Sequence, residues 1–492
     1  ISGGSMVVSC EEMARAEAAF FTGDRSAEPY MDEAGRKCAD AISFFFPRPA
    51  NAEIFCGKGN NGGDALVVAR WLKRRGWQIN IHYSHGPEGL PELGKKKEGE
   101  FRAEPEADTS NSGNELVLVD GLLGIGASGP LRGGIREMAD RLNNIRRTEF
   151  ATCFAIDVPT GLDGDTGEPY DGAVVADYTL SITAAKTGFT RERSINHVGR
   201  LVEVPLGIPV EGDDSIRFLF PSNLRPRLLR RDFDFHKGKA GRVSIVAGAP
   251  GTTGAAILTA LGASHTGAGL TTLFVENDIF PLVAAKCPPE VMVRPVGSVR
   301  DILEQETDVL AIGPGLGASP REDLIDQIWS NPLPMVVDAG GLNALAKDGR
   351  SLSDLPANRL LTPHPGELKR LADCDDDRVT LTRKLAEEWG VTLLHKGSRT
   401  AISTPRHPVE LNTTGHPGMA SGGMGDVLTG VCASLIGQGL STHDAACVGS
   451  WLIGRAAEVA RDRESVAESS VTAPLMARHL GAAMRDLEKG GL

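Results

Sequence analysis

The chain has 492 residues, more than a single hydrophobic core usually serves, so two or three domains are expected. Apolar residues make up 41% of the chain and charged residues 24%, which argues against a disordered, collagen-like or coiled-coil protein. The 52 basic and 64 acidic side chains give a net charge of −12, so the chain as a whole does not attract nucleic acid or anionic membranes. Any anionic ligand must therefore be bound locally.

Glycine and cysteine narrow the possibilities further. The 59 glycines imply many tight turns, of the kind that can surround phosphate groups. The eight cysteines contain no CxxC pair, so we expect neither a zinc site nor a disulfide framework, and none has a histidine at a spacing that would suggest a catalytic role. Cys432 and Cys447 are expected in helix cores. No apolar run approaches the roughly 18 residues of a membrane helix, and a soluble, cytoplasmic protein is expected.

The first half of the chain begins with a helix-rich segment at 11–41 and continues with short apolar runs that alternate with glycine-rich turns and amphipathic stretches. This alternation is typical of βαβ units around a mostly parallel sheet. The polar segment Lys95–Glu115 is expected to be a surface excursion. Strands are predicted at Glu53–Cys56, Leu116–Val119 and Phe154–Ile156, and helices at Leu66–Arg75 and Ile135–Leu142.

A basic segment with two prolines, Ile216–Asp234, lacks strand alternation and is the expected domain boundary. A second βαβ series follows it, and its last long helices are predicted at Val427–Ile436 and Asp444–Arg461. The predicted fold is therefore α/β, with two tandem three-layer α/β/α domains at 6–215 and 216–492. The strands of the second series are predicted at Arg242–Ala247, Leu270–Val275, Asp308–Ile312, Met335–Asp338, Arg359–Leu361 and Val391–His395.

Three turns of the first half carry glycines and acidic residues directly after predicted strands. They lie at 57–64, 120–130 and 157–161. Ligands of open parallel sheets bind outside the carboxyl ends of the strands, and a glycine-rich helix start can bind phosphate. Each turn alone is more simply a capped tight turn, with Asp64 as a helix cap. Together they favour a shared site, in which Asn61, Asp120 and Thr160 offer oxygen ligands for a small cation that spacing alone does not identify.

Four motifs in this half, CGKGNNGGD, VDGLLGIG, AIDVPTGLDGDTG and TAAKTG, resemble the epimerase domain of the NAD(P)H-hydrate repair proteins. The resemblance implies a Rossmann-like fold, a potassium ion and interconversion of the two C6 epimers of hydrated NADH or NADPH. It implies that Asp157 is the catalytic acid/base with Lys186 nearby, and that Asn61, Asp120 and Thr160 bind potassium. The hydrated dinucleotide would contact Asn60, Asn61, Gly62, Gly63, Asp64, Gly124, Ile125, Gly126, Ala127, Ser128, Gly129, Pro130 and Asp157.

The chemistry fits these residue types. A carboxyl group beside C6 can protonate the departing hydroxyl while the ring nitrogen forms an iminium, and water can then return to either face. Two residues depart from the family pattern. Ala65 stands where glycine is usual, and Thr160 stands where serine is commoner but keeps the hydroxyl oxygen. Ligand approach is therefore in question only near Ala65.

The second half contains the longest glycine-rich motif, GHPGMASGGMGDVL at 415–428. Its glycines leave backbone N–H groups open at a helix start, and an aspartate follows within reach of a bound anion. Taken alone, the motif is more simply a helix start. Further small-residue turns follow the strands of this half, namely GAPGTTG, IGPGLG, TPHPGE and HKGSRT.

This series resembles the ribokinase-like superfamily and, within it, the dehydratase half of the same repair proteins. The resemblance implies ADP-dependent dehydration of the S epimer, with Asp426 as the base, and magnesium normally accompanies such transfers. Gly340 and His416 depart from the family's usual aspartate and asparagine. Lys396, Gly397, Ser398, Arg399, Thr400 and Gly425 would contact ADP, and Ala255, Gly317, His364 and Asp426 would contact the hydrate.

Two alternatives remain open at this stage. Ribokinase-like sites share Gly-x-Gly-Asp, so the chain could be an ATP-dependent kinase of a small vitamin or sugar precursor. The N-terminal half could be a non-catalytic binding module, although such a module would not need Asn61, Asp120 and Asp157. His364 could be a turn residue and Lys396 a solvated lysine. The resemblance also implies small-molecule substrates, a homo-oligomer and a cytoplasmic location.

Overall fold

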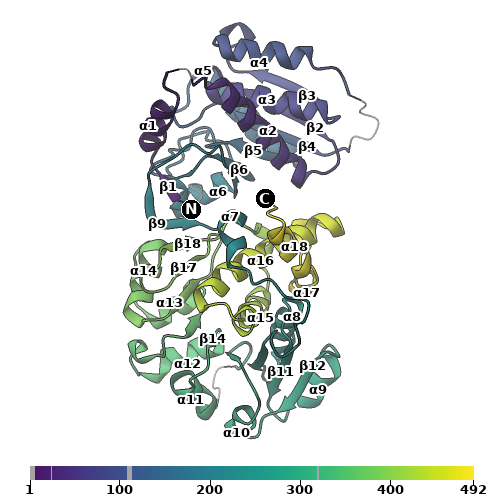
Figure 1. The fold of residues 1–492 in the computed structure, drawn as a ribbon, viewed down its shortest axis with the longest axis vertical. Helices are drawn as coiled ribbons and strands as arrows, with labels where there is room; N and C mark the ends of the chain where they lie inside the picture. Colours follow the sequence, from purple (N-terminus) through teal and green to yellow (C-terminus); the bar gives the residue numbers. More distant parts are fainter. Residues whose placement is uncertain (1–5, 24, 108–112, 318–320, 492) are drawn as a thin grey trace. The chain divides into compact units, whose positions relative to one another are not determined.

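The structure, a computed structural model, describes residues 6–23, 25–107, 113–317 and 321–491. It divides into two compact units, one ending at Phe220 and the other covering Pro221–Gly491. Both units are built on largely parallel β-sheets covered by helices, which confirms the predicted α/β class (Figure 1). Each unit is described by itself below.

The main sheet of the first unit has the strand order β3-β2-β4-β5-β6-β8, and all its neighbouring strands are parallel. A smaller arrangement joins β1 to β7 in parallel and to β9 in antiparallel. The strands of the unit are β1 (Met6–Val8), β2 (Asn51–Cys56), β3 (Gln78–Tyr83), β4 (Leu116–Gly121), β5 (Thr152–Ile156), β6 (Tyr178–Ile182), β7 (Ala185–Lys186), β8 (Arg200–Val204) and β9 (Asp213–Phe218).

Alternate residues of β4 reach two separate apolar cores, because successive side chains of a strand point to opposite faces. Val117 and Val119 pack with residues of α2 and α3, whereas Leu118 packs with α5. Figure 1 shows α2 and α3 side by side over the sheet. The helices are α1 (Cys10–Phe20), α2 (Glu28–Phe45), α3 (Asn60–Arg74), α4 (Glu92–Ala103), α5 (Gly133–Thr148) and α6 (Ile195–Val198).

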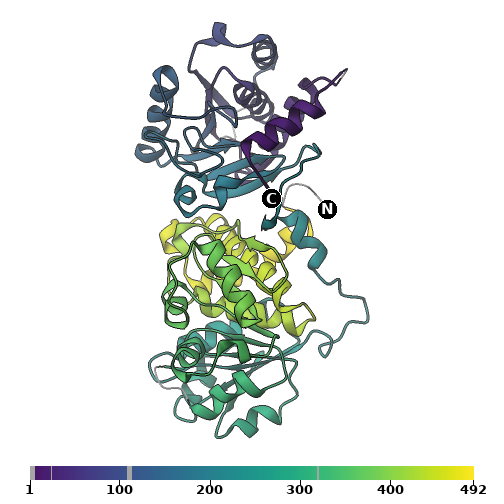
Figure 2. The same ribbon diagram turned by 90° about the vertical axis from the view of Figure 1, so that its left-hand side faces the viewer.

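Two expectations for the first unit are wrong. The polar segment Lys95–Glu115 is not simply a surface excursion, because its first part lies in α4, where Lys97 is buried and ion-paired with Glu28 and Asp32. A basic residue that looks solvated in the sequence is here matched by carboxylates of α2. Part of that segment, 108–112, lies outside the described residues. The boundary segment also begins in a strand, β9, although residues 228–241 contain no helix or strand (Figure 2).

The sheet of the second unit has the order β12-β11-β10-β13-β14-β15-β16-β17-β18. Its strands are parallel from β12 to β16, and β17 and β18 follow in antiparallel. The strands are β10 (Arg242–Val246), β11 (Leu270–Val275), β12 (Val291–Pro295), β13 (Val309–Ile312), β14 (Met335–Val337), β15 (Arg359–Leu361), β16 (Thr392–His395), β17 (Ala401–Ser403) and β18 (Val409–Leu411).

Helices cover both faces of this sheet. One core joins the strands to α11, α12 and α14, while α8, α15 and α16 pack together elsewhere on the sheet. Helices α8 and α15 approach closely, since a Cβ on Gly430 would lie 1.9 Å from the Thr259 carbonyl oxygen. Figure 2 shows α16, α17 and α18 gathered together in yellow. Within the described ranges, no helix has the length and apolar character needed to cross a membrane.

The helices of the second unit complete the inventory of elements. They are α7 (Pro221–Leu224), α8 (Thr253–His265), α9 (Phe280–Lys286), α10 (Val299–Leu303), α11 (Glu322–Ser330), α12 (Gly340–Asp348), α13 (Pro365–Leu371), α14 (Arg378–Trp389), α15 (Met424–Gly437), α16 (Thr442–Glu464), α17 (Ala473–Arg478) and α18 (Leu480–Glu488). The long helices predicted near the C-terminal end correspond to α15 and α16. Cys432 and Cys447 lie fully buried within them, as expected.

Candidate active sites

The turn between β2 and α3 is packed too tightly for side chains. A Cβ on Gly57 would lie 1.8 Å from the Leu122 carbonyl oxygen, and a Cβ on Gly62 would lie 2.0 Å from the Gly57 carbonyl oxygen. Glycine at both positions therefore lets the start of α3 approach the end of β4. The exposed Asn60 opens this helix, and its first N–H groups have no side-chain cap.

The three predicted cation ligands meet beside this turn. The Thr160 hydroxyl donates to Asp120 Oδ1 over 2.7 Å, and its backbone N–H donates to Asp120 Oδ2 over 2.8 Å. Asn61 donates its side-chain amide to the carbonyls of Leu123 and Ile156, over 2.7 and 3.2 Å. Leu123 links the group, because its N–H donates to Thr160 Oγ1 over 3.0 Å. The chain thus brings the residues together from α3, β4 and the turn after β5.

The chemistry of this cluster suits a hard cation. Asp120 is fully buried, and burial raises the pKa of its carboxyl to about 6 against the opposing hydrogen bonds from Thr160 and Leu122. Asn61, Thr160 and the nearby carbonyls add only oxygen donors, the type that hard cations take. A bound cation would supply the positive charge that favours the ionised Asp120.

The predicted acid/base, Asp157, is paired with the predicted neighbour Lys186. Asp157 directly follows β5 and has a positive φ of 64°, a conformation that non-glycine residues rarely adopt. Its Oδ1 accepts from Lys186 Nζ over 2.5 Å and from the Ile182 N–H over 3.2 Å. Lys186 is fully buried and also donates to the Ala184 carbonyl over 2.9 Å. The pair is therefore fixed in the fold rather than formed by mobile surface side chains.

Two further carboxyls share the electrostatic environment of this pair. Burial, together with the charges of Asp157 and Glu17, raises the pKa of Asp64. Burial and Asp157 likewise raise the pKa of Glu17, while Lys186 opposes them. Asp64 was predicted as a substrate contact, but Glu17 lies on α1, far from the quoted motifs, and sequence reasoning missed it.

The predicted substrate loop at 124–130 lines a small cavity. The cavity has a volume of about 120 Å³, and Val158, Pro159, Gly161 and Leu162 form its other wall. Gly124 also adjoins Asn61, since a Cβ on Gly124 would lie 3.6 Å from the Asn61 side chain. The loop, the cation cluster and the segment after Asp157 therefore form one continuous site at the carboxyl ends of the strands.

The unusual Ala65 does not face this cavity. Its side chain is fully buried in the core between α3 and the sheet, where a Cβ on Gly121 would lie 2.4 Å from the Ala65 Cβ. The extra methyl group is accommodated by glycine on β4. Alanine in place of the family's usual glycine at this position therefore alters packing inside the domain.

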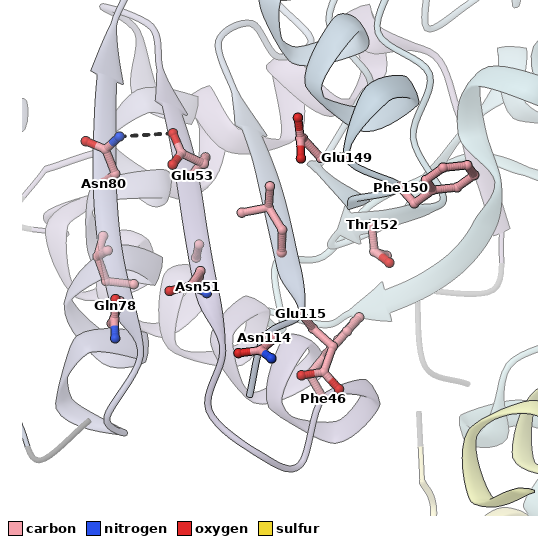
Figure 3. Close-up of a pocket in the computed structure, with 13 residues that line it drawn as sticks. Phe46, Asn51, Glu53, Gln78, Asn80, Asn114, Glu115, Glu149, Phe150 and Thr152 are labelled. Carbon is pink, nitrogen blue, oxygen red and sulfur yellow. Dashed lines mark hydrogen bonds between the residues drawn. The ribbon is translucent and has the colours of Figure 1, made fainter. Parts of the chain in front are cut away.

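A larger cavity, of about 600 Å³, opens at the amino ends of the strands (Figure 3). Asn51 and Glu53 on β2 and Gln78 and Asn80 on β3 point into it, and Asn80 donates to Glu53 over 3.0 Å. None of the predicted site residues lines it. It lies at the opposite end of the strands from the cation cluster, so this cavity is not the predicted site.

In the second unit, the longest glycine-rich motif leads into α15. Gly423 precedes the helix with a positive φ of 92°, which glycine adopts without strain. Gly425 and Asp426 lie in the first turn of α15. Burial and the neighbouring charge of Asp338 raise the pKa of the Asp426 carboxyl to about 6. A carboxyl of this kind can accept a proton near neutral pH.

Lys396, which follows β16, is anchored by a residue that sequence reasoning did not select. Its Nζ donates to Asp338 Oδ1 over 2.7 Å, and Thr429 on α15 donates to Asp338 Oδ2 over 2.9 Å. Burial lowers the pKa of Lys396, but the Asp338 and Glu367 charges raise it above its ordinary value. Lys396 is therefore a fixed cation at the start of α15, not a solvated lysine.

Asp338 and Glu367 were both visible as polar residues after strands. Asp338 directly follows β14, just as Asp157 follows β5, and the next residue, Ala339, has a positive φ of 43°. The buried Glu367 caps α13, where it accepts from the His364 N–H over 2.9 Å and lies 3.9 Å from Lys396 Nζ. The same rule that selected Asp157 would have selected Asp338.

His364 has both a structural and an exposed side. Its Nδ1 accepts from the N–H groups of Gly366 and Glu367, over 3.0 and 3.3 Å, so it caps α13. About half of its side chain stays exposed, at 52%. The turn interpretation is correct, and an exposed imidazole face remains for a ligand.

The predicted nucleotide segment, 396–400, is a turn held from both sides. Arg378 donates to the Lys396 carbonyl over 2.8 Å, and Thr400 donates to the Gly397 carbonyl over 3.1 Å. Ser398 is exposed at its tip, whereas Arg399 and Thr400 are buried. The segment shares the Lys396 end with Gly425, because a Cβ on Gly425 would lie 3.2 Å from Lys396 Nζ.

The remaining predicted contacts lie around two loops. Ala255 opens α8 against Gly315, since a Cβ on Gly315 would lie 2.8 Å from the Ala255 Cβ. Gly317 is exposed in the same loop, with a positive φ of 76°. A Cβ on the buried Gly340 would lie 2.9 Å from the Gly313 carbonyl oxygen, so a side chain there would press on the loop that carries Gly317. The departure at Gly340 therefore affects the shape of this loop.

His416, the second departure, caps the short turn before the glycine motif. Its Nδ1 accepts from the Gly418 N–H over 3.2 Å, and its buried Nε2 has no hydrogen-bond partner among the described residues. Its place is structural, at one end of the motif whose other end carries Asp426.

Comparison with solved structures assigns the second unit to a class. An ADP/ATP-dependent NAD(P)H-hydrate dehydratase from Bacillus subtilis, crystallised with ATP and Mg²⁺, matches with a TM-score of 0.50 and 27% identity, covering 55% of this chain and 98% of that one. A ribokinase-like superfamily protein from Enterococcus faecalis matches with a TM-score of 0.50 and 25% identity, covering 56% and 98%. The fold and the sites thus define a two-unit α/β enzyme whose second unit is ribokinase-like.

Sequence comparison defines the family. Residues 27–188 match the family described as YjeF-related protein N-terminus, and residues 243–480 match the family described as NAD(P)H-hydrate dehydratase. Bifunctional NAD(P)H-hydrate repair enzymes named Nnr are similar over most of their length. The protein from Moorella thermoacetica is 37% identical, covering 88% of each chain, and that from Escherichia coli K12 is 34% identical, covering 87% of this chain and 84% of its own. The chain belongs to the family of bifunctional NAD(P)H-hydrate repair enzymes.

Proposed function

We propose that the chain repairs hydrated NADH and NADPH with two activities, epimerisation at C6 in the first unit and nucleotide-dependent dehydration of the S epimer in the second. One observation carries the proposal. Each unit holds a lysine–aspartate ion pair, Lys186–Asp157 or Lys396–Asp338, beside a glycine-rich helix start at the carboxyl ends of its strands. A charged dinucleotide and a reacting hydroxyl need both features together.

In the first unit, the 124–130 loop and the start of α3, residues 60–64, hold the dinucleotide. The Asp157 carboxyl group gives its proton to the C6 hydroxyl, which leaves as water while the ring nitrogen's electron pair forms the iminium. Water then adds to either face and returns the proton, so atoms and charge balance. Lys186 holds the Asp157 carboxylate in place through the 2.5 Å contact.

Potassium is proposed at Asn61, Asp120 and Thr160. All three offer oxygen, and the buried Asp120 carboxyl lacks a described cationic partner. The cation would fix the turns that carry the substrate-binding residues. Asp120→Asn should therefore reduce the stimulation of epimerisation by potassium chloride relative to tetramethylammonium chloride, and equal stimulation in both proteins would contradict this ligand set.

In the second unit, the proposed co-substrate is ADP. Asp426 takes the proton of the C6 hydroxyl while the hydroxyl oxygen attacks the terminal phosphorus of ADP, and AMP leaves. The start of α15, Lys396 and the 397–400 turn stabilise the charge on the phosphoryl oxygens. Loss of phosphate from C6 and of a proton from C5 then restores the dihydronicotinamide. Ala255, Gly317, His364 and Asp426 hold the hydrate, and Gly425 lies beside the nucleotide.

Magnesium fits the nucleotide end of this site. The Glu367 carboxylate is buried near Lys396 and supplies the hard oxygen that Mg²⁺ prefers. When bound, the ion would neutralise phosphate charge. The kinase alternative receives less support, because the relatives that match most of the chain are named as repair enzymes and the matched dehydratase structure is named for the same reaction.

Paired variants test the two activities in one protein. Asp426→Asn should lower dehydration by about 10²–10⁴-fold while epimerisation continues, because only the second unit loses its base. Asp157→Asn should do the reverse. Epimerisation is followed by separating the two hydrates without nucleotide, and dehydration by the return of reduced-nicotinamide absorbance with ADP or ATP.

Three results would overturn the assignment. They are wild-type dehydration by Asp426→Asn, wild-type epimerisation by Asp157→Asn, and phosphorylation of a sugar or pyrimidine by ATP with no turnover of the hydrate. The first two would displace individual residues. The third would replace the function.

A homo-oligomer and a cytoplasmic location complete the proposal, on the family resemblance alone. Size-exclusion chromatography with light scattering tests the first, and a mass equal to one chain, 52.1 kDa, would contradict it. Fractionation of the source cells tests the second.

A further inference from the structure

A cluster of metal-ligand side chains lies in the second unit, and none of the predicted site residues belongs to it. Glu410 on β18, His443 and Cys447 are buried, and their ligand atoms lie within 4.8 Å of one another. His443 and Cys447 are four residues apart on α16 and so project from one face of the helix. This histidine–cysteine spacing differs from the CxxC pattern, whose absence was the reason to expect no zinc site.

The distances place three donors on one carboxylate oxygen. Glu410 Oε2 lies 3.0 Å from His443 Nε2, 2.8 Å from Cys447 Sγ and 2.6 Å from Arg227 Nη1. A carboxylate oxygen offers two lone pairs, and Arg227 occupies one of those on Glu410 Oε2. The protons on His443 Nε2 and Cys447 Sγ therefore compete for the other lone pair. A cation between His443 and Cys447 would replace that competition with a single bond to Oε2.

The groups around the cluster support ligands rather than compete with them. Thr404 Oγ1 lies 2.9 Å from His443 Nδ1, where it can accept the proton of the tautomer that leaves Nε2 free for a metal. Arg227 also bonds Glu410 Oε1 over 2.5 Å, and Asp444 lies 3.5 Å from Arg227. Hydrogen-bonded ligands of this kind are typical of metal sites in proteins.

The charges also favour a divalent ion. With a thiol and a neutral imidazole, the buried Glu410, the part-buried Arg227 and the more exposed Asp444 together carry a net charge of −1. Zn²⁺ adds two positive charges and the thiolate one negative charge, which brings the total to zero. Thiolate, imidazole and carboxylate are together the donors that Zn²⁺ takes.

We infer that Glu410, His443 and Cys447 form a zinc site that ties β18 to α16. Binding replaces the S–H proton of Cys447, which is released to solvent, and moves the His443 proton from Nε2 to Nδ1, so that Zn²⁺ bonds Sγ, Nε2 and Oε2. No electron is transferred. The site serves structure, since its three side chains are buried in the protein.

The test adds Zn²⁺, with no other ligand, to the full-length chain. Protein stripped with a chelator is titrated with Zn²⁺ against a chromophoric competitor, and bound metal is counted by mass spectrometry. One zinc per chain is expected, and Co²⁺ in its place should give a thiolate charge-transfer band. Cys447→Ser should lose both signals, and Thr404→Val should bind zinc about 10–100-fold more weakly.

Cys432→Ser is the matched control, because Cys432 is equally buried on α15 and belongs to no such cluster in the described chain. It should keep the zinc and the cobalt band. The inference is overturned if the wild-type chain stays zinc-free at micromolar zinc, or if Cys447→Ser binds like the wild type. If Cys447→Ser does not fold, the wild-type cobalt spectrum decides, since a band without thiolate character excludes Cys447.

Discussion

Each unit has a lysine–aspartate ion pair, but the aspartate of the pair has a different role in each unit. In the first unit Lys186 contacts the proposed catalytic aspartate itself, over 2.5 Å, whereas in the second Lys396 contacts Asp338, over 2.7 Å, and no cationic side chain among the described residues pairs directly with Asp426. Burial and Asp338 accordingly raise the pKa of Asp426 to about 6. In the proposed mechanism, Lys186 holds the reacting carboxylate of Asp157. Lys396 instead binds a phosphate oxygen, and Asp338 holds Lys396 in position.

This difference matches the chemistry required of each site. Epimerisation moves a proton to and from one hydroxyl, so a carboxylate in a rigid ion pair suffices. Phosphoryl transfer needs a base and a cation at two different oxygens, so the lysine and the base must be separate. Variants that each lack one of the side chains in these pairs test this difference between the two units.

Removal of Lys186 should have the largest effect. Lys186→Met leaves Asp157 buried without its cation, which costs about 3–5 kcal/mol of stability and should lower epimerisation by roughly 100-fold or more. Thermal unfolding and separation of the two hydrates without nucleotide measure these effects. Dehydration of the S epimer should persist at a temperature where the variant remains folded.

Lys95→Met, on the exposed side of α4, serves as the control and should leave both activities unchanged. Wild-type epimerisation by Lys186→Met would show that the ion pair has no part in the reaction. The contrast between the two lysines would then rest on the second unit alone.

Removal of Asp338 should shift the pH profile of dehydration. A base must be ionised, so the wild-type rate should rise with pH through about 6 and level off above it, in keeping with the raised pKa of Asp426. Asp338→Asn removes the like charge that helps to raise this pKa, so the acid limb should move to lower pH. Its plateau should fall by about 10-fold as Lys396 loses its anchor.

Asp326→Asn, at the surface of α11, is the matched substitution and should keep the wild-type profile. An acid limb that stays in place in Asp338→Asn would contradict the electrostatic coupling between the two aspartates. The comparison of KM for ADP with kcat separates loss of nucleotide binding from loss of the base.

The smallest effect is expected at Thr429. Thr429→Val removes the 2.9 Å hydrogen bond that steadies Asp338 and should cost about 1 kcal/mol, or roughly 5-fold in dehydration. Thr266→Val, which loses a bond to the Gly262 carbonyl on α8, is the control. A fall no larger than in the control would leave Asp338 anchored by Lys396 alone.

The fold and the first site were largely predictable because both follow local rules. Short apolar runs marked the central strands, and polar residues after β4 and β5 marked Asp120 and Asp157. Asp338 obeys the same rule, but the sequence pattern placed it inside the predicted strand, whereas β14 ends one residue earlier, at Val337. Glu17 could not be found this way, because its approach to Asp157 depends on where α1 packs.

Contacts between distant segments were the remaining gap. The salt-bridged Lys97 of α4 looked solvated because its partners Glu28 and Asp32 lie more than 60 residues earlier. His443 and Cys447 are one helical turn apart, but Glu410 and Arg227 join them only through the packing of β18 and the turn before residue 228. Spacing along a chain records neighbours on one element and not between elements.

The backbone at Asp157 constrains how this position can evolve. At a φ of 64° most side chains are strained, and asparagine and aspartate are the non-glycine residues that tolerate the conformation best. A mutation to asparagine would keep the turn and the surrounding loop while removing the acid. Asp157→Asn is therefore expected to give a folded domain that lacks the proposed acid but still binds its ligand. A single substitution would then convert an enzyme into a binding protein.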